Sequence, residues 1–309
     1  MLHRRIRPAL ILGALALALP AFGADEKGDK LELRLRSRAE AGGKVEVVET
    51  PATWSARETA IIVCDMWDSH HCKNAVERVG ELAPTMDRVL KAARGRGVAI
   101  IHAPSGCVEA YKDHPARRHA TATPRAKVLP AEIGSWCYQI PGEAKGTYPI
   151  DQSDGGEDDD PAEHAAWVAD LAAKGRNPKA PWTSEVAALG IEPSDYISDD
   201  GGEVWSILED RRVKNVILIG VHLNMCVLGR PFGLRQMSRN GKTVALMRDM
   251  TDTMYNPKRA PYVDHFAGTD LMIAHVERYV APTIASDQIL GGAPFRFSGD
   301  ERDEAARGR

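Results

Sequence analysis

The residues best suited to chemistry in this sequence follow short apolar runs. Asp65 comes directly after TAIIVC, His102 follows VAII, and His222 and Cys226 lie in the segment after NVILIG. Ligands of open α/β sheets bind beyond the carboxyl ends of the strands, so these side chains are expected at one edge. We therefore take Asp65, His102, His222 and Cys226 as catalytic candidates, with either histidine able to serve as a general acid or base near neutral pH.

Cys226 is the candidate nucleophile. A cysteine that opens a helix lies at the positive end of the helix dipole, which lowers the thiol pKa and favours the thiolate. Free N–H groups of the first turn could receive an oxyanion, and Asp65 could move the thiol proton. Cys226 could instead be a small buried apolar residue, and Asp65 an N-cap or turn residue.

Three further residues at the same strand ends are expected to line a substrate pocket. They are Trp67, Asn224 and Asp249. Trp67 has a second interpretation, as a side chain that only packs.

The elements that would position these residues alternate between strand and helix. Continuous apolar runs separated by helical patterns predict a parallel sheet with right-handed crossovers. The expected elements are strands at 59–64, 98–101, 215–220 and 243–247, and helices at 81–96, 226–239 and 264–279.

Two other regions do not follow this alternation of strands and helices. Period-2 alternation on both sides of a glycine-containing turn predicts a β-hairpin within residues 25–58. Residues 104–195 are rich in proline and glycine, with one helix expected at 162–174, and are interpreted as an insertion that covers one end of the sheet. The main domain is expected over 59–296, followed by a charged tail at 297–309.

Two of these segments resemble a known family. TAIIVCDMWD resembles the first-strand motif, and NVILIGVHLNMCVLGRPFGLRQMSRNGKTVALMRD resembles the nucleophile segment, of isochorismatase-like cysteine hydrolases. This family includes nicotinamidases, isochorismatases and carbamoyl-amide hydrolases. The resemblance covers residues 55–103 and 196–280, which is less than half of the chain.

The resemblance implies an α/β, three-layer Rossmann-like fold with a mostly parallel, about six-stranded sheet. It implies a cysteine nucleophile, an acidic acid/base residue and frequent homo-oligomers. It also implies a cis peptide between Val221 and His222, with an oxyanion hole formed by the backbone N–H groups of His222 and Cys226.

The sequence departs from the family pattern at the third catalytic residue. The family has a lysine on the strand before the nucleophile strand, whereas the counterpart here is YISDD, residues 196–200. Lys112, Lys174 and Lys179 are elsewhere in the chain, and their spacing favours none of them.

No cofactor is required by these motifs, and metal binding stays open. The Asp-x-His motif of nicotinamidases is replaced by HAPS at 102–105. Histidines near this edge could still hold a metal, namely His70, His71, His102, His114 and His119. The acidic run DQSDGGEDDD, residues 151–160, could bind calcium or form a solvated loop.

The N-terminal residues predict export. A basic start, the apolar run ALILGALALAL and small residues before position 25 are typical of a signal peptide over 1–24. We therefore expect a periplasmic or extracellular protein with no membrane association after cleavage. Five cysteines allow up to two disulfides and leave at least one thiol unpaired within the monomer. A formal net charge of −3 disfavours nucleic-acid binding.

Three functions follow from these observations. The first is a hydrolase that cleaves a C–N bond of a small-molecule amide through a thioester at Cys226. The second is a noncatalytic small-molecule-binding protein on the same fold, since the family lysine is missing. The third is an isochorismatase-type hydrolase that does not use the thiol.

Overall fold

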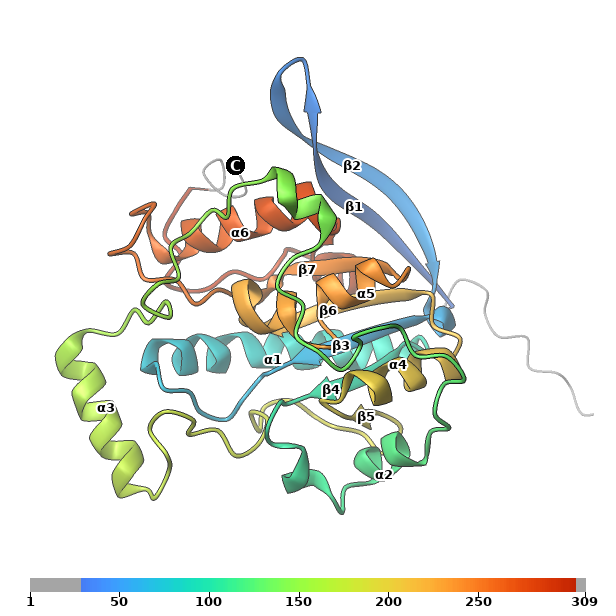
Figure 1. The fold of residues 1–309 in the computed structure, drawn as a ribbon, viewed down its shortest axis with the longest axis horizontal. Helices are drawn as coiled ribbons and strands as arrows, with labels where there is room; N and C mark the ends of the chain where they lie inside the picture. Colours follow the sequence, from blue (N-terminus) through green and yellow to red (C-terminus); the bar gives the residue numbers. More distant parts are fainter. Residues whose placement is uncertain (1–28, 304–309) are drawn as a thin grey trace, which may run out of the picture.

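A central sheet with helices on both faces forms the body of the molecule (Figure 1). This computed structural model describes residues 29–303, so the predicted signal peptide lies outside the described residues. No helix within 29–303 combines the length and apolar character needed to cross a bilayer.

The sheet has eight strands in the order β2-β1-β8-β7-β6-β3-β4-β5. Six of them form the parallel part: β3 (Thr59–Cys64), β4 (Ala99–Ala103), β5 (Tyr196–Ile197), β6 (Asn215–Val221), β7 (Thr243–Asp252) and β8 (Thr283–Ile284). The predicted mostly parallel α/β sheet is confirmed. Two antiparallel strands of the hairpin raise the strand number above the expected six.

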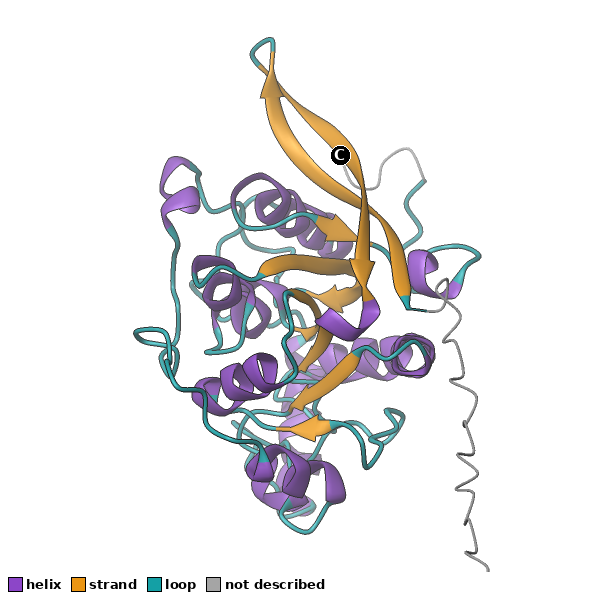
Figure 2. Cartoon of the chain, turned by 90° about the vertical axis from the view of Figure 1, so that its right-hand side faces the viewer, coloured by secondary structure: helices purple, strands orange, loops and turns teal. Residues whose placement is uncertain are grey.

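The predicted N-terminal hairpin is present within residues 25–58. Strands β1 (Lys30–Ala41) and β2 (Lys44–Ser55) pair along their whole length, and β1 joins the sheet where Arg36 pairs with Thr283 of β8. Its turn projects beyond the body of the molecule (Figure 2). Only its base contributes to the core, through Leu31, Leu33 and Trp54, because the rest has no layer to pack on.

Helices cover both faces of the sheet, which gives the three layers. On one face lie α1 (Lys73–Gly95) and α7 (Asp287–Leu290), packed against alternate residues of β3 and β6. On the other lie α2 (Pro115–Ala122), α4 (Gly201–Asp210), α5 (Leu234–Arg239) and α6 (His265–Tyr279). Strands β3 and β6 are buried along their entire length, as their continuously apolar sequences require.

Helix α1 starts eight residues before its predicted position, at Lys73 rather than residue 81. Its N-cap residue, Cys72, makes no side-chain cap. The Asp159 carboxylate from the acidic run accepts hydrogen bonds from the backbone N–H groups of Lys73 and Asn74, at 2.8 and 2.9 Å. Because this cap comes from a distant segment, no local signal marks the start of the helix.

The region 104–195 is ordered throughout and contains two α-helices. Helix α3 (Pro161–Ala173) matches the predicted helix at 162–174, whereas α2 was not predicted. Figure 1 shows α3 at the periphery of the molecule, away from the sheet. The described part of the charged tail is also held in place, since Arg302 Nη1 donates to Asp270 of α6 at 2.9 Å.

Candidate active site

Asp65 lies immediately beyond β3, at the carboxyl edge of the sheet. Its backbone has a φ of 48°, a left-handed conformation that aspartate tolerates better than most residues. The side chain is fully buried, and its Oδ1 accepts a hydrogen bond from the backbone N–H of Ser105 at 2.8 Å. Strand β4 thereby fixes the orientation of the carboxylate, because Ser105 follows that strand.

Cys226 lies in a π-helical turn, Leu223–Val227, that follows β6. The predicted helix over 226–239 is therefore wrong in its extent, since α5 begins only at Leu234. Pro231 stands between the two helical segments, where it can prevent a continuous helix. The thiol is still placed at the expected edge and is 8% exposed.

Close approach of β6 to β3 brings the Cys226 loop toward Asp65. Gly220 has a φ of 104°, and a Cβ at this position would overlap the carbonyl oxygen of Cys64. Only glycine adopts this positive φ readily and also leaves room for the Cys64 carbonyl oxygen. The peptide bond between Val221 and His222 is cis, as the family resemblance implied.

Arg230 completes the cluster and was missed by the sequence analysis. Its Nε donates to Asp65 Oδ2 at 3.1 Å, and both Arg230 and Asp65 act electrostatically on the Cys226 thiol. Trp136 from the insertion covers the guanidinium, whose carbon lies 5.3 Å from the ring centroid. The available signal was a cation four residues after the predicted nucleophile, in the same loop.

The protonation of this cluster differs from the expectation based on the helix dipole. Burial, together with the Asp65 carboxylate, raises the pKa of Cys226, while Arg230 opposes this effect. Burial also raises the pKa of Asp65, with Arg230 and the thiol acting in the opposite direction. The pKa of the thiol is therefore raised, opposite to the direction expected from the helix dipole.

A small cavity adjoins Asp65 and is lined by Trp67, His70 and His222. Trp67 stacks on Trp182 from the insertion, with ring centroids 4.3 Å apart, and Nε1 of Trp67 donates to Ser105 O at 3.1 Å. Burial lowers the pKa of His222 to about 4, so its ring is neutral at pH 7. The expected proximity of Trp67 and His222 to Asp65 is confirmed.

Asn224 fixes the nucleophile loop to the segment after β7. Its side-chain amide donates to Met254 O at 2.8 Å, and its Oδ1 accepts from Met254 N at 2.9 Å. The carbonyl oxygen of Asn224 accepts hydrogen bonds from Tyr148 Oη and Gln152 Nε2 of the insertion. Asn224 and these two residues also line a cavity of about 600 Å³.

His102 lies in β4 and contacts other residues than those of the cluster. Its Nδ1 is 2.8 Å from Glu185 Oε2, and its Nε2 is 3.5 Å from Asp195 Oδ2. Burial disfavours its charged form, but Glu185 and Asp195 outweigh this effect and raise its pKa to about 9. Its geometry is that of a buried imidazolium held by two carboxylates, which does not match the expected acid/base role.

Asp249 is likewise separate from the predicted pocket. It lies inside β7, which extends five residues beyond the predicted end at 247, and its Oδ1 accepts from Ser286 N at 2.9 Å. An irregular register between β6 and β7 allows this extension and could not be read from the apolar pattern. Asp252 takes the position at the carboxyl end of the strand.

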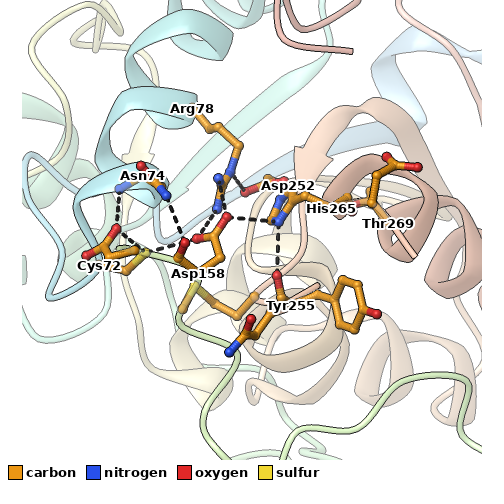
Figure 3. Close-up of polar contacts among 12 residues, drawn as sticks. Cys72, Asn74, Arg78, Asp158, Asp252, Tyr255, His265 and Thr269 are labelled. Atoms are coloured by element: carbon orange, nitrogen blue, oxygen red, sulfur yellow. Dashed lines mark hydrogen bonds and ion pairs between the residues drawn. The ribbon is translucent and has the colours of Figure 1, made fainter. Parts of the chain in front are cut away.

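Asp252 belongs to a buried ionic network (Figure 3). Arg78 of α1 donates to Asp252 at 2.7 Å and to Asp158 at 2.9 Å, and His265 lies between the same two carboxylates, at 2.8 and 3.3 Å. Asp252 and Asp158 outweigh burial and raise the pKa of His265 to about 9. This network joins α1, the acidic run, β7 and α6 at one edge of the sheet.

Potential metal ligands gather in two groups within the described chain. These are Cys72, Asp158 and Asp159, and Glu157, Asp159 and His164, with ligand atoms in each group within 4.8 Å of one another. Neither group contains any of the five histidines predicted as possible ligands. Asp158 and Asp159 from the acidic run are already engaged, by Arg78 and by the start of α1.

Comparison with solved structures finds similar folds at low sequence identity. They include a cysteine hydrolase from Pseudomonas syringae pv. phaseolicola 1448A, with 15% identity and a TM-score of 0.45, covering 77% of this chain and 92% of that chain. An isochorismatase family protein from Burkholderia thailandensis has 15% identity and a TM-score of 0.33, covering 63% and 79%. Another isochorismatase family protein, from Desulfovibrio vulgaris subsp. vulgaris str. Hildenborough, has 13% identity and a TM-score of 0.37, covering 71% and 90%.

No protein-family model and no curated protein matches the chain.

Proposed function

We propose that the protein is a cysteine hydrolase that cleaves a C–N bond of a small amide. The observation that carries this proposal is the cluster in which Arg230 pairs with the buried Asp65 and both act electrostatically on the buried Cys226 thiol. A thiol with a proton acceptor and a cation nearby meets the requirements of an activated nucleophile.

The reaction begins with proton transfer from the thiol to Asp65 as the sulfur attacks the carbonyl carbon. Backbone N–H groups of His222 and Cys226 would stabilise the oxyanion. Collapse breaks the C–N bond, and Asp65 returns its proton to the leaving amine. Water then attacks the thioester, Asp65 accepts the proton of the water, and collapse releases a carboxylic acid while the thiol regains its proton.

Arg230 would take the place of the family lysine in this reaction. Its positive charge opposes the effects that raise the thiol pKa, so it favours the thiolate that attacks. It also holds Asp65 in position through the contact at 3.1 Å. A partly buried cation at this position supports a catalytic site rather than the noncatalytic binding protein that the missing lysine suggested.

The remainder of the substrate would occupy the cavity of about 600 Å³ beside Asn224. Trp136, Tyr148 and Gln152 contribute aromatic and amide groups to its lining. Its ionic groups neutralise each other, since Arg235 makes two hydrogen bonds to Glu143, at 2.7 and 2.8 Å. We therefore expect an uncharged group on the acyl or amine side of the substrate.

The test is mass spectrometry of the protein after mixing with a panel of small aliphatic and aromatic amides. A covalent acyl adduct on Cys226 is expected, with ammonia or amine released in solution. Cys226→Ala should abolish both adduct and turnover, while the control Cys137→Ser should retain both. Turnover by Cys226→Ala would overturn the thioester route and would instead favour an isochorismatase-type hydrolase that does not use the thiol.

A further inference from the structure

A second cavity, of about 560 Å³, lies between β1, β7, α6 and the C-terminal segment. Its volume is within the range of small-molecule sites. Arg36 of β1 and Arg248 of β7 line one part of it, and Phe266, Phe295 and Phe297 line another. Cys226 and Asp65 are not part of its wall.

Arginines and aspartates both line this cavity, namely Arg36, Arg248, Arg296 and Arg302 with Asp249, Asp270 and Asp300. Arg302 pairs with Asp270 and Asp300 at 2.9 and 2.8 Å, and Glu277 pairs with Arg36 at 2.6 Å and with Arg38 at 3.0 Å. Among residues 29–303, Arg248 has no carboxylate within 4.0 Å, and its nearest hydrogen-bond partner is Thr283 Oγ1 at 3.5 Å. A long, weak contact of this kind leaves most of the guanidinium donors available to a ligand.

The neighbouring Asp249 makes no ion pair with Arg248 within the described residues. The Asp249 carboxylate accepts hydrogen bonds from Ser286 N, Ser286 Oγ and Phe295 N. Burial and the nearby Arg36 lower the pKa of Arg248, while Asp249, Glu277 and Asp287 act in the opposite direction. A bound anion would further stabilise a partly buried cation that has no direct ion pair.

The opposite part of the cavity is aromatic. Phe297 stacks on Phe266 with ring centroids 5.4 Å apart and meets Phe295 edge to face at 5.1 Å. These rings offer an apolar surface to the non-ionic part of a ligand.

We propose that this cavity is a second binding site, for a small aromatic or apolar molecule that carries a carboxylate or phosphate group. Arg248 would bind the anionic group through two N–H donors, and the phenylalanine rings would contact the apolar part. The site is independent of the proposed hydrolysis, because its wall contains none of the residues of the Cys226 cluster.

The test is titration calorimetry of the purified protein with benzoate and phenyl phosphate as probes, and benzyl alcohol as the uncharged control. Saturable binding of at least one anion is expected with a dissociation constant of about 1 mM or lower. Arg248→Met should weaken binding at least about tenfold. Arg88→Met, which removes an exposed arginine of α1, should leave binding unchanged, and so should Cys226→Ala.

Arg248→Lys serves as a second variant if Arg248→Met does not fold. This substitution keeps the positive charge but loses the bidentate hydrogen bonding of the guanidinium, so anion binding should be weaker than in the wild type. The far-ultraviolet circular dichroism spectrum should be unchanged, which would show that the variant is folded. The relative affinities of benzoate and phenyl phosphate decide between a carboxylate and a phosphate ligand. No saturable binding of either anion, or equal binding by wild type and both Arg248 variants, would overturn the proposal.

Discussion

Arg230 lies 3.1 Å from Asp65 although 165 residues separate them in the sequence. The contact joins the segments that follow β3 and β6, and it places a positive charge beside the Asp65 carboxyl group and close to the Cys226 thiol. Arg230 and Asp65 act on the Cys226 pKa in opposite directions, which allows their effects to be measured without knowledge of the substrate.

Arg230→Met is expected to slow alkylation of Cys226 by iodoacetamide at neutral pH by roughly tenfold, because loss of the cation raises the thiol pKa further. The measurement is the rate of adduct formation on the Cys226 peptide by mass spectrometry between pH 6 and 10. Arg230→Lys should recover part of the rate, and Arg239→Met, on the exposed face of α5, should match the wild type. An unchanged rate in Arg230→Met would contradict the assigned role.

Asp65→Asn should have the opposite effect on alkylation. Removal of the carboxylate eliminates a charge that raises the Cys226 pKa, so the thiolate should form at lower pH and react roughly tenfold faster near pH 7. Turnover of any amide found as a substrate should nevertheless fall by at least about 100-fold, because the proton carrier is lost. Slower alkylation together with retained turnover would rule out this function for Asp65.

The pH dependence of stability tests the buried His102. Its pKa is raised from the ordinary value of about 6.5 to about 9, so its ion pairs stabilise the folded protein fully below pH 6.5. The free energy of unfolding should then fall as pH rises toward 9, by up to about 1.4 kcal/mol per unit. Urea denaturation of the wild type, His102→Gln and Glu185→Gln at several pH values measures this slope. Both variants should have a smaller slope than the wild type. Some slope should remain, because the raised pKa of His265 contributes in the same pH range. Equal slopes in all three proteins would refute the assignment.

Asp159→Ala tests whether the acidic run starts helix α1. Loss of two hydrogen bonds to Lys73 N and Asn74 N should lower the free energy of unfolding by about 1–2 kcal/mol. Chemical denaturation gives the change, and Glu163→Ala, an exposed acidic residue of α3, is the matched control. A change no larger than that of the control would show that the cap is dispensable.

The five cysteines are all free and buried in the described structure. A thiol reagent such as DTNB should therefore react with five thiols per chain after denaturation, and with far fewer in the native protein. Recovery of three thiols or one would mean that disulfides form, as the cysteine count alone allowed.

Local sequence was sufficient to predict the features that depend on single segments. Continuous apolar runs identified β3, β4, β6 and β7, and the residues after them included Asp65 and Cys226 at the same sheet edge. Those predictions succeeded because one short segment of sequence determines both a buried parallel strand and the position of its carboxyl end.

The remainder depends on contacts between distant segments. The role of Arg230 appears only once β3 and β6 are adjacent, and the true start of α1 only once Asp159 reaches it. Asp249 was misplaced because the length of β7 is set by its neighbours in the sheet rather than by its own pattern. Such relationships leave no periodic signal in the sequence.

The cap that Asp159 provides for α1 also limits how the protein can be re-engineered. A chimera in which residues 104–195 are exchanged for the shorter connection of another protein would leave the first N–H groups of α1 without acceptors. That helix packs against β3, the strand that immediately precedes Asp65. The insertion and α1 therefore have to be transplanted, or varied, as one unit.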